Sequence, residues 1–189
     1  NILPPGVERH VVNGGGLTGF QVFPDDEIEI VNNEGNQICE IICFNKNGKS
    51  ELGILNLKEN SKKNYIKNIL LGKDETILAT NYQLKKRNLN IADSHAAIIF
   101  DPDTNAGEVI KLKSKDKCYA IFAAPGDDMD VTNQNPPGEL TIFIKRSKIT
   151  NDKELNVIPD PVFEPAHEEN ILRQSCTSYE VKEGDYIQI

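Results

Sequence analysis

The stretch HAAIIFDPDTNAGEVIKLKSKDKCYAIFA, residues 95–123, contains three apolar runs separated by two polar clusters. The runs are rich in Ile, Val, Phe and Tyr, which pack well on a pleated sheet. The first cluster contains Pro, Asn, Asp and Gly. It can reverse the chain, because Pro presets φ while Asn and Gly accept positive φ. The stretch therefore predicts three strands, with antiparallel neighbours across this first cluster.

The same pattern of apolar runs and turn residues extends outward to both sides. The predicted strands are Val7–Val12, Gly19–Phe23, Glu27–Val31, Ile38–Phe44, Thr76–Thr80, His95–Phe100, Val109–Lys113, Lys117–Ala123 and Leu140–Lys145. Such a series is typical of a mainly β protein, an antiparallel β-sandwich or barrel. The alternation at Ile28-Glu-Ile predicts a sheet with one wet face, whereas the continuous runs at Ile98 and Ile121 predict central strands.

One helix is predicted between these strands, with Ser61 as its candidate cap and Gly72 as its terminator. Its apolar positions, at helical spacing, are Tyr65, Ile66, Ile69 and Leu70. The stretch Tyr82–Ile91 fits either a second helical segment or a surface crossing. We therefore expect one or two short helices.

The character of the chain changes after Arg146, where polar residues and three prolines, Pro159, Pro161 and Pro165, are spread over a long stretch. Proline fixes φ and removes a backbone donor, so this stretch predicts an extended connector. The expected organisation is a β-rich domain over residues 1–146, a linker over 147–178, and the first strand of a following domain over 179–189.

A short repeat supports this organisation. Residues 20–30, FQVFPDDEIEI, and residues 179–189, YEVKEGDYIQI, share their aromatic, Val, Asp and two Ile positions without a gap. Each copy predicts a strand, a tight turn and a second strand, which indicates an internal duplication. The alternative is that many hairpins share this pattern. If the repeat is genuine, the chain stops in mid-strand at Ile189 and is a truncated fragment of a longer polypeptide.

A family resemblance rests on the same two regions. Residues 4–6, PPG, and 19–37, GFQVFPDDEIEIVNNEGNQ, resemble the start of the urea carboxylase-associated protein family. Together with residues 176–189, CTSYEVKEGDYIQI, they resemble the leading part of large bacterial proteins. Those proteins carry such domains ahead of an aminomethyltransferase domain like the glycine-cleavage T-protein. A His-Asp-Thr and Cys motif of that family has no equivalent here, so no active residue is transferred.

The resemblance implies a non-catalytic β-rich module that packs against or orients the catalytic part of a longer protein. Its partners would be the C-terminal domains of the same polypeptide. A second copy of the chain, in a homo-oligomer, is a further possible partner. The parent protein would be a folate-dependent aminomethyltransferase that uses tetrahydrofolate, while this segment itself would hold no cofactor.

Composition excludes some classes of partner. The formal net charge of −8 argues against a nucleic acid, which is bound by neutralising phosphates with Lys and Arg. The chain contains no apolar run long enough to cross a membrane as a helix. The cysteines, Cys39, Cys43, Cys118 and Cys176, form no Cys-x-x-Cys pair and have no His at ligand spacing. This is a reduced, cytoplasmic pattern in which the thiols in the apolar runs act as small hydrophobic groups.

The residues themselves offer one candidate ligand-binding region. Asp127, Asp128 and Asp130, in a loop that extends to Glu139, supply the hard oxygen ligands that calcium prefers, although their spacing departs from a helix-loop-helix site. The ordinary interpretation is a solvated acidic loop, and we assign no catalytic or metal-ligating residue.

The second hypothesis is a small-molecule-binding or metal-dependent enzyme domain that uses this loop with His95 or His10. It predicts a pocket in which acids and a histidine converge. The first hypothesis instead predicts an exposed apolar patch near Phe20–Ile30 or at the C-terminal strand.

Overall fold

The computed structural model describes residues 3–126 and 136–147, and every structural statement below concerns these residues. The elements along them are β1 (Val7–Val12), β2 (Leu17–Val22), β3 (Glu27–Asn32), β4 (Cys39–Asn45), η1 (Leu52–Leu55), α1 (Tyr65–Ile69), α2 (Glu75–Lys86), η2 (Ile91–Asp93), β5 (Ala96–Phe100), β6 (Glu108–Lys113), β7 (Cys118–Ala123) and β8 (Leu140–Lys145). The mainly β class is confirmed.

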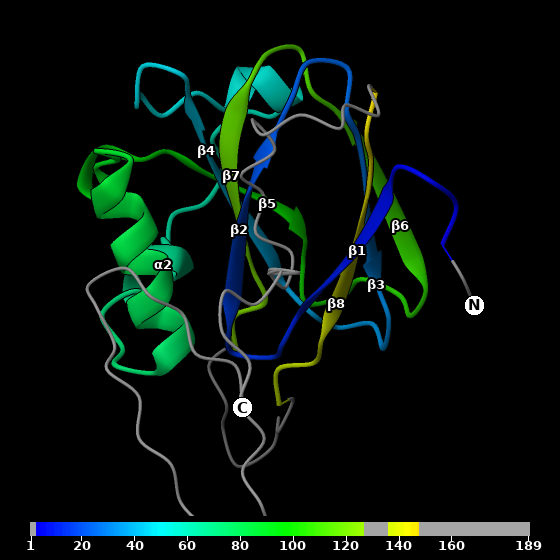
Figure 1. Ribbon diagram of the computed structural model, residues 1–189. Coiled ribbons are helices and arrows are strands. Elements are labelled where there is room, and N and C mark those ends of the chain that lie inside the picture. Colours follow the sequence, from blue (N-terminus) through cyan, green and yellow to red (C-terminus); the bar gives the residue numbers. More distant parts are fainter. Residues whose placement is uncertain (1–2, 127–135, 148–189) are drawn as a thin grey trace, which may run out of the picture. The chain divides into compact units, whose positions relative to one another are not determined.

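The strands form two four-stranded antiparallel sheets, with orders β1-β8-β3-β6 and β2-β7-β4-β5 (Figure 1). Each tight turn carries the chain from one sheet to the other. The prediction that the strands flanking the first polar cluster of residues 95–123 are antiparallel neighbours is therefore wrong, since β5 and β7 lie in one sheet and β6 in the other. A turn reverses the chain, but burial of both apolar faces decides which strands pair.

The first sheet has one buried and one wet face. Ile28 and Ile30 of β3 are fully buried between the sheets, where they contact the inner residues of β7 and β8. Glu29 points outward and forms an ion pair with Lys111 of β6 at 3.1 Å. The alternating pattern of β3 therefore predicted its two faces correctly.

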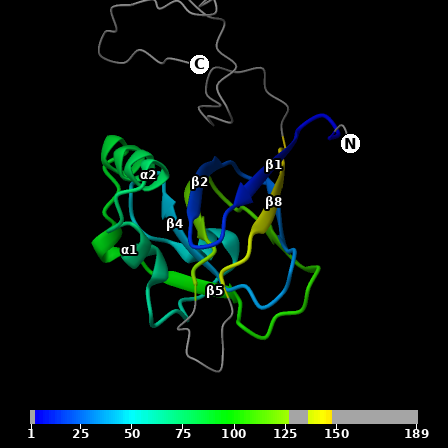
Figure 2. The same cartoon turned by 90° about the horizontal axis from the view of Figure 1, so that it is seen from below.

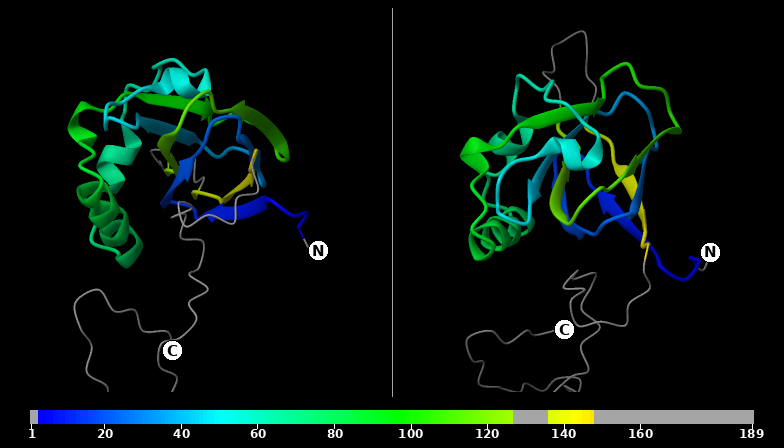
Figure 3. Two further views of the ribbon diagram at one scale, coloured as in Figure 1. Left: turned by 45° about the horizontal axis from the view of Figure 1, so that its top comes forward. Right: turned by 90° about the horizontal axis from the view of Figure 1, so that it is seen from above.

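The second sheet is buried on both faces. Helices α1 and α2 cover its outer face, on the side away from β1 and β8 (Figures 2 and 3). Phe44 of β4 and Ile121 of β7 pack there against Ile66 and Ile77 from the helices. This double burial explains the continuous apolar runs, and β7 is a central strand as predicted. The run at Ile98 lies instead in β5, at the edge of the sheet, so that prediction is wrong.

The predicted strand Thr76–Thr80 is also wrong, because these residues lie in α2. Ile77 and Leu84, seven residues apart and so two helical turns, are buried against the sheet. A five-residue window is too short to separate this helical period from a strand. The stretch after Tyr82 continues α2 as far as Lys86, which decides the ambiguity in favour of a helix.

Helix α1 forms where it was predicted, but Ser61 does not cap it. The residue at the cap position is Asn64, which has a positive φ of 50° and makes no side-chain cap hydrogen bond. Ser61 donates its hydroxyl to Glu40 of β4 instead. None of the described helices is long and apolar enough to cross a membrane.

The first copy of the repeat comprises β2, a turn and β3, and it crosses between the two sheets. Phe20, Ile28 and Ile30 are buried in the core, so the exposed apolar patch expected there is absent from the described residues. The second copy, the C-terminal strand and nearly all of the predicted linker lie outside the described residues. The domain boundaries therefore stay predictions.

Candidate functional site

The predicted ligand-binding residues are not brought together by the described part of the chain. His95 lies just before β5 with its side chain 57% exposed, and its Nδ1 is 2.9 Å from Oε2 of Glu59. Asp127, Asp128 and Asp130 lie outside the described residues. No group of three or more His, Cys, Asp or Glu side chains placed to hold a metal occurs within residues 3–126 and 136–147.

Gln37 fixes the backbone on both sides of the acidic loop. Its side-chain Nε2 donates to the carbonyl oxygens of Pro125 and Ile38, both at 2.8 Å. Its Oε1 accepts from the N–H of Gly138 at 2.6 Å. Gln37 is only 2% exposed, so these bonds form away from water, where an unmade bond is costly. The start and the end of the connection between β7 and β8 are therefore held by one amide group.

A polar cluster lies where the chain leaves β8, and we call Glu8, His10, Asp26 and Arg146 the Arg146 cluster. The guanidinium of Arg146, whose side chain is 4% exposed, binds both oxygens of Glu8 at 2.7 and 2.9 Å. It also binds Asp26 at 2.7 Å and the carbonyl oxygen of Gln21 at 2.9 Å. One cation thus holds two carboxylates from different strands and turns.

His10 extends this cluster toward the aromatic core. Its Nε2 is 3.1 Å from Oε2 of Glu8, and its ring stacks on Phe20 with centroids 4.9 Å apart. Phe20 in turn stacks on Phe122. A carboxylate that holds an imidazole in a fixed orientation is the arrangement by which proteins position a proton acceptor. Glu8 and His10 therefore have the arrangement of a positioned proton acceptor; Glu59 and His95 make a similar contact, but on the exposed surface.

The sequence contained only part of the signal for this cluster. Glu8 and His10 are two residues apart on a predicted strand, so their side chains share one face. Arg146 is 138 residues away from Glu8, and no local pattern joins them.

The balance of effects on Glu8 gives a prediction for the pH dependence of stability. Burial raises the pKa of Glu8, but hydrogen bonds and charge from His10 and Arg146 outweigh it, so the net pKa lies below 4.5. The folded state therefore favours the ionised carboxylate. Its contribution to stability is complete above about pH 4.5 and is lost as pH falls through the folded-state pKa.

The measurement is urea unfolding between about pH 3 and 6 for the wild type and Glu8→Gln. We expect the stability difference between the two proteins to shrink steadily as the pH falls below about 4.5. A difference that is constant with pH would contradict a lowered Glu8 pKa.

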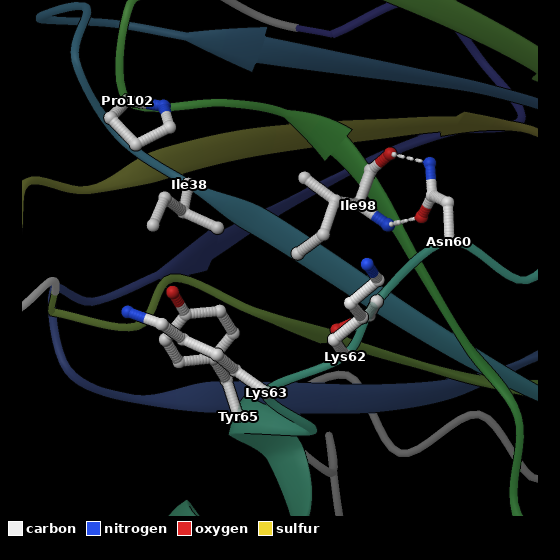
Figure 4. Close-up of a pocket in the computed structure, with 8 residues that line it drawn as sticks. Ile38, Asn60, Lys62, Lys63, Tyr65, Ile98 and Pro102 are labelled. Atoms are coloured by element: carbon white, nitrogen blue, oxygen red, sulfur yellow. Dashed lines mark hydrogen bonds between the residues drawn. The ribbon is translucent and has the colours of Figure 1, made fainter.

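A pocket of about 360 Å³ lies between the segment that leads into α1 and the strands β4 and β5 (Figure 4). The residues around it are Ile38, Asn60, Ser61, Lys62, Lys63, Tyr65, Ile98 and Pro102. Aliphatic groups of Ile38, Ile98 and Pro102 form one part of its lining. Two lysines and an aromatic ring form another, so this pocket does not match the predicted convergence of acids and a histidine.

Two sets of hydrogen bonds fix the walls of this pocket. The side chain of Asn60 bonds to both the N–H and the carbonyl oxygen of Ile98, at 2.6 and 3.1 Å. Glu40, buried on β4, accepts from the hydroxyl of Ser61 and from the N–H of Ile66, the latter at 2.7 Å. The segment from residue 60 to 66 is therefore attached to the sheet at both ends.

The three described cysteines play the structural part that was predicted. Cys39, Cys43 and Cys118 are free thiols buried in the core between the sheets. Burial raises the pKa of the Cys39 thiol, which disfavours the reactive thiolate. Cys176 lies outside the described residues.

Comparison with known proteins gives one strong similarity. No protein-family model matches the chain. The chain is 32% identical over 187 residues to a protein named trimethylamine-oxide aldolase from Ruegeria pomeroyi. The match covers 99% of this chain and 24% of that protein. The chain therefore spans about a quarter of the length of the curated relative that it matches.

This similarity corrects the family resemblance and what was inferred from it. The relative is named as an aldolase, so the resemblance to aminomethyltransferase-like and T-protein-like proteins is wrong, and so is the function of a non-catalytic module. Partner domains were inferred from a connector followed by a truncated strand. The match runs through nearly all of the chain instead of two short motifs, so the basis of that inference is wrong.

Proposed function

We propose that this chain is a domain of an enzyme that acts on trimethylamine oxide or a closely related small methylated amine oxide. The observation that supports this proposal is the 32% identity over 187 residues to trimethylamine-oxide aldolase. An enzyme domain that binds a small molecule is the second of the two hypotheses from the sequence. The chain covers a quarter of that relative, so the activity proposed is that of the whole protein.

The substrate limits the chemistry. An aldolase releases an aldehyde, and the carbon of trimethylamine oxide is all in methyl groups. The aldehyde is therefore formaldehyde, and the remainder is dimethylamine; together they contain every atom of the substrate. A proton must leave a methyl carbon and the nitrogen–oxygen bond must break. The same carbon must then bond to the oxygen and separate from the nitrogen, which takes up a proton. The Glu8 and His10 pair, joined at 3.1 Å, is the described arrangement suited to accept that proton.

The experiment is a product assay on the protein that contains this chain at its natural full length. Incubation with trimethylamine oxide should release formaldehyde and dimethylamine in equal amounts. Trimethylamine, which lacks the oxygen, should release neither. A folded protein that yields no formaldehyde from trimethylamine oxide, or that yields trimethylamine, would contradict the proposal.

A pair of histidine variants tests the role of His10. Replacement of His10 by Asn should lower kcat about 100-fold, in the range that a positioned general base contributes. The matched control is His95→Asn, because His95 is exposed and paired only with Glu59 among the described residues. If both variants lower kcat equally, or neither lowers it, His10 has no role in the mechanism. The product assay then remains the test of the proposed function.

Three expectations from the sequence stay predictions within this proposal. If tetrahydrofolate takes part, its addition should capture the released formaldehyde faster with the protein than without it. If the acidic loop binds a metal, analysis of the purified protein should find a stoichiometric amount. Cell fractionation tests the cytoplasmic location.

A further inference from the structure

The carboxylate of Glu8 lies between a guanidinium and an imidazole. Arg146 donates to both of its oxygens, from Nε to Oε1 at 2.7 Å and from Nη2 to Oε2 at 2.9 Å. The ring nitrogen Nε2 of His10 is 3.1 Å from the same Oε2. The fork of two parallel bonds fixes the plane of the carboxylate. Glu8 therefore presents one oxygen, in one orientation, to the imidazole.

The ionisation of Glu8 decides which partner donates in the contact with His10. Burial opposes the charged carboxylate, yet the net pKa of Glu8 lies below its ordinary value. Burial also lowers the pKa of Arg146, but hydrogen bonds and charge from Glu8 and Asp26 outweigh it, so Arg146 stays protonated. An ionised carboxylate carries no hydrogen and can only accept. The hydrogen between Glu8 and His10 therefore belongs to Nε2 of the imidazole.

The other ring nitrogen of His10, Nδ1, then carries the lone pair. A neutral imidazole has one hydrogen, so a donor at Nε2 leaves Nδ1 as an acceptor. Among the described residues, the buried side-chain atoms without a hydrogen-bond partner are Oδ1 of Asn32 and Nε of Arg87. Nδ1 is not one of them, no described residue donates to it, and the side chain of His10 is 16% exposed. Nδ1 is therefore open to solvent and to a small molecule.

His95 makes the opposite contact and serves as a natural comparison. Its Nδ1, and not its Nε2, is 2.9 Å from Oε2 of Glu59. Both of these side chains are more than half exposed, at 57% and 55%. Water competes with such a bond, so it contributes little to the choice of tautomer. The chain thus contains the same pair of residue types twice, joined through different nitrogens and in different surroundings.

We infer that Glu8 and Arg146 hold His10 as the tautomer with its hydrogen on Nε2, and that Nδ1 is the nitrogen that accepts a proton from the substrate. In the proposed reaction a bond forms between Nδ1 and hydrogen while the bond between methyl carbon and hydrogen breaks, and its electron pair stays on the substrate. The imidazolium keeps its Nε2 contact with the carboxylate. Glu8 and Arg146 are positioning residues, because they act through the ring. The role of Nδ1 rests on the proposed function, but the tautomer does not.

The test is nitrogen NMR of the imidazole rings in the 189-residue chain, isotope-labelled at its three histidines, at about pH 8, where an ordinary imidazole is neutral. The variants His10→Asn and His95→Asn assign the signals. For His10, Nε2 should have the shift of a protonated nitrogen and Nδ1 that of an unprotonated one. A hydrogen bond to a charged group should favour this tautomer at least about tenfold.

The shifts can also overturn the inference. The reverse pattern at His10, or shifts that average the two tautomers, would show that Glu8 does not set the position of the hydrogen. His95 should show averaged shifts, because its contact is exposed. If His95 prefers a hydrogen on Nε2 as strongly as His10 does, the preference belongs to imidazole itself and the positioning role is wrong.

Matched variants separate positioning from stability. Glu8→Gln keeps the shape of the side chain, but an amide can donate as well as accept, so His10 should become a mixture of tautomers. Arg146→Lys keeps the charge without the fork, and its tautomer ratio should lie between those of the wild type and Glu8→Gln. The control is Asp26→Asn, because Asp26 binds Nη1 of Arg146, whereas Glu8 binds Nε and Nη2.

The control should lose stability and keep the wild-type tautomer of His10. If Asp26→Asn changes the tautomer ratio as much as Glu8→Gln, the tautomer reflects loosening of the whole cluster and the inference is wrong. An unchanged ratio in Arg146→Lys would remove Arg146 from the positioning residues.

The product assay distinguishes this inference from the proposed function. With trimethylamine oxide, Glu8→Gln in the full-length protein should lower kcat about tenfold or more and leave KM nearly unchanged, because Glu8 acts on the base and not on substrate binding. A hydrogen on Nε2 in a protein that releases no formaldehyde would keep the positioning and overturn the proposed function. Formaldehyde release by a protein whose His10 carries its hydrogen on Nδ1 would do the reverse.

Discussion

Replacement of Arg146 by Met is expected to lower the free energy of unfolding by about 3–5 kcal/mol, because it removes one partner of a buried ionic network. Asp26 is 1% exposed and would lose its only cationic partner among the described residues. Glu8 would lose a bidentate contact and keep His10 alone. Met is shorter than Arg but has an unbranched side chain of similar volume, so the loss is mainly one of charge and hydrogen bonds.

The measurement is equilibrium unfolding in urea. The dependence of the unfolding free energy on urea concentration should be the same for the wild type and the variant. Lys145→Met is the matched control, because Lys145 is the neighbouring residue and its ion pair with Glu27 is long, at 3.7 Å, and exposed. That variant should change the free energy of unfolding by less than about 1 kcal/mol. If both variants lose the same unfolding free energy, the Arg146 cluster stabilises the fold no more than a surface ion pair does.

A double variant tests whether the network acts as a unit. Asp26→Asn alone should also destabilise the fold, because Arg146 would then face a neutral amide. The combined variant should lose less than the sum of the single losses, since each single change already breaks the same interaction. Full additivity would show that Asp26 and Arg146 do not depend on each other, against the 2.7 Å contact between them.

Replacement of Glu40 by Leu is the second large effect, with an expected loss of about 2–4 kcal/mol of unfolding free energy. Glu40 is fully buried on β4 and accepts from the hydroxyl of Ser61 and the N–H of Ile66. Leu removes both acceptors and leaves two buried donors without partners. The N–H of Ile66 belongs to the first turn of α1, which has no intrahelical acceptor of its own.

Two further variants define what is lost. Glu40→Gln keeps one acceptor oxygen and should lose roughly half as much as Glu40→Leu. Glu59→Gln, at an exposed acid of the same region, should change the unfolding free energy by less than about 1 kcal/mol. Urea unfolding measures all three. A Glu40→Leu protein as stable as the wild type would mean that Ser61 and Ile66 find other acceptors.

The candidate sites were only partly predictable from the sequence. The shared face of Glu8 and His10 follows from strand periodicity. Two polar residues on a predicted strand are nevertheless no stronger a candidate for a functional site than an acidic loop. The choice of His95 rested on its place beside a strong strand, and the structure puts it on the outside with Glu59. The pocket beside β5 combines residues 38, 60–65, 98 and 102, which no motif connects.

The sequence by itself determined the class of fold and the positions of most strands. The bounds of β1 and β8 match the predicted ones, and the alternation in β3 gave its buried and wet faces. These features depend on neighbours within a few residues, through backbone preference and the two-residue period of a strand. That is why a single stretch of sequence is enough to indicate them.

Only the tertiary structure decided which strands pair, that Thr76–Thr80 is helical, and that Arg146 meets Glu8 and Asp26. Pairing follows from burial of two apolar faces at once, which is a property of the whole set of strands. The buried position of Arg146 likewise depends on carboxylates from distant segments of the chain. An unpaired charge inside the fold is far costlier than one in water.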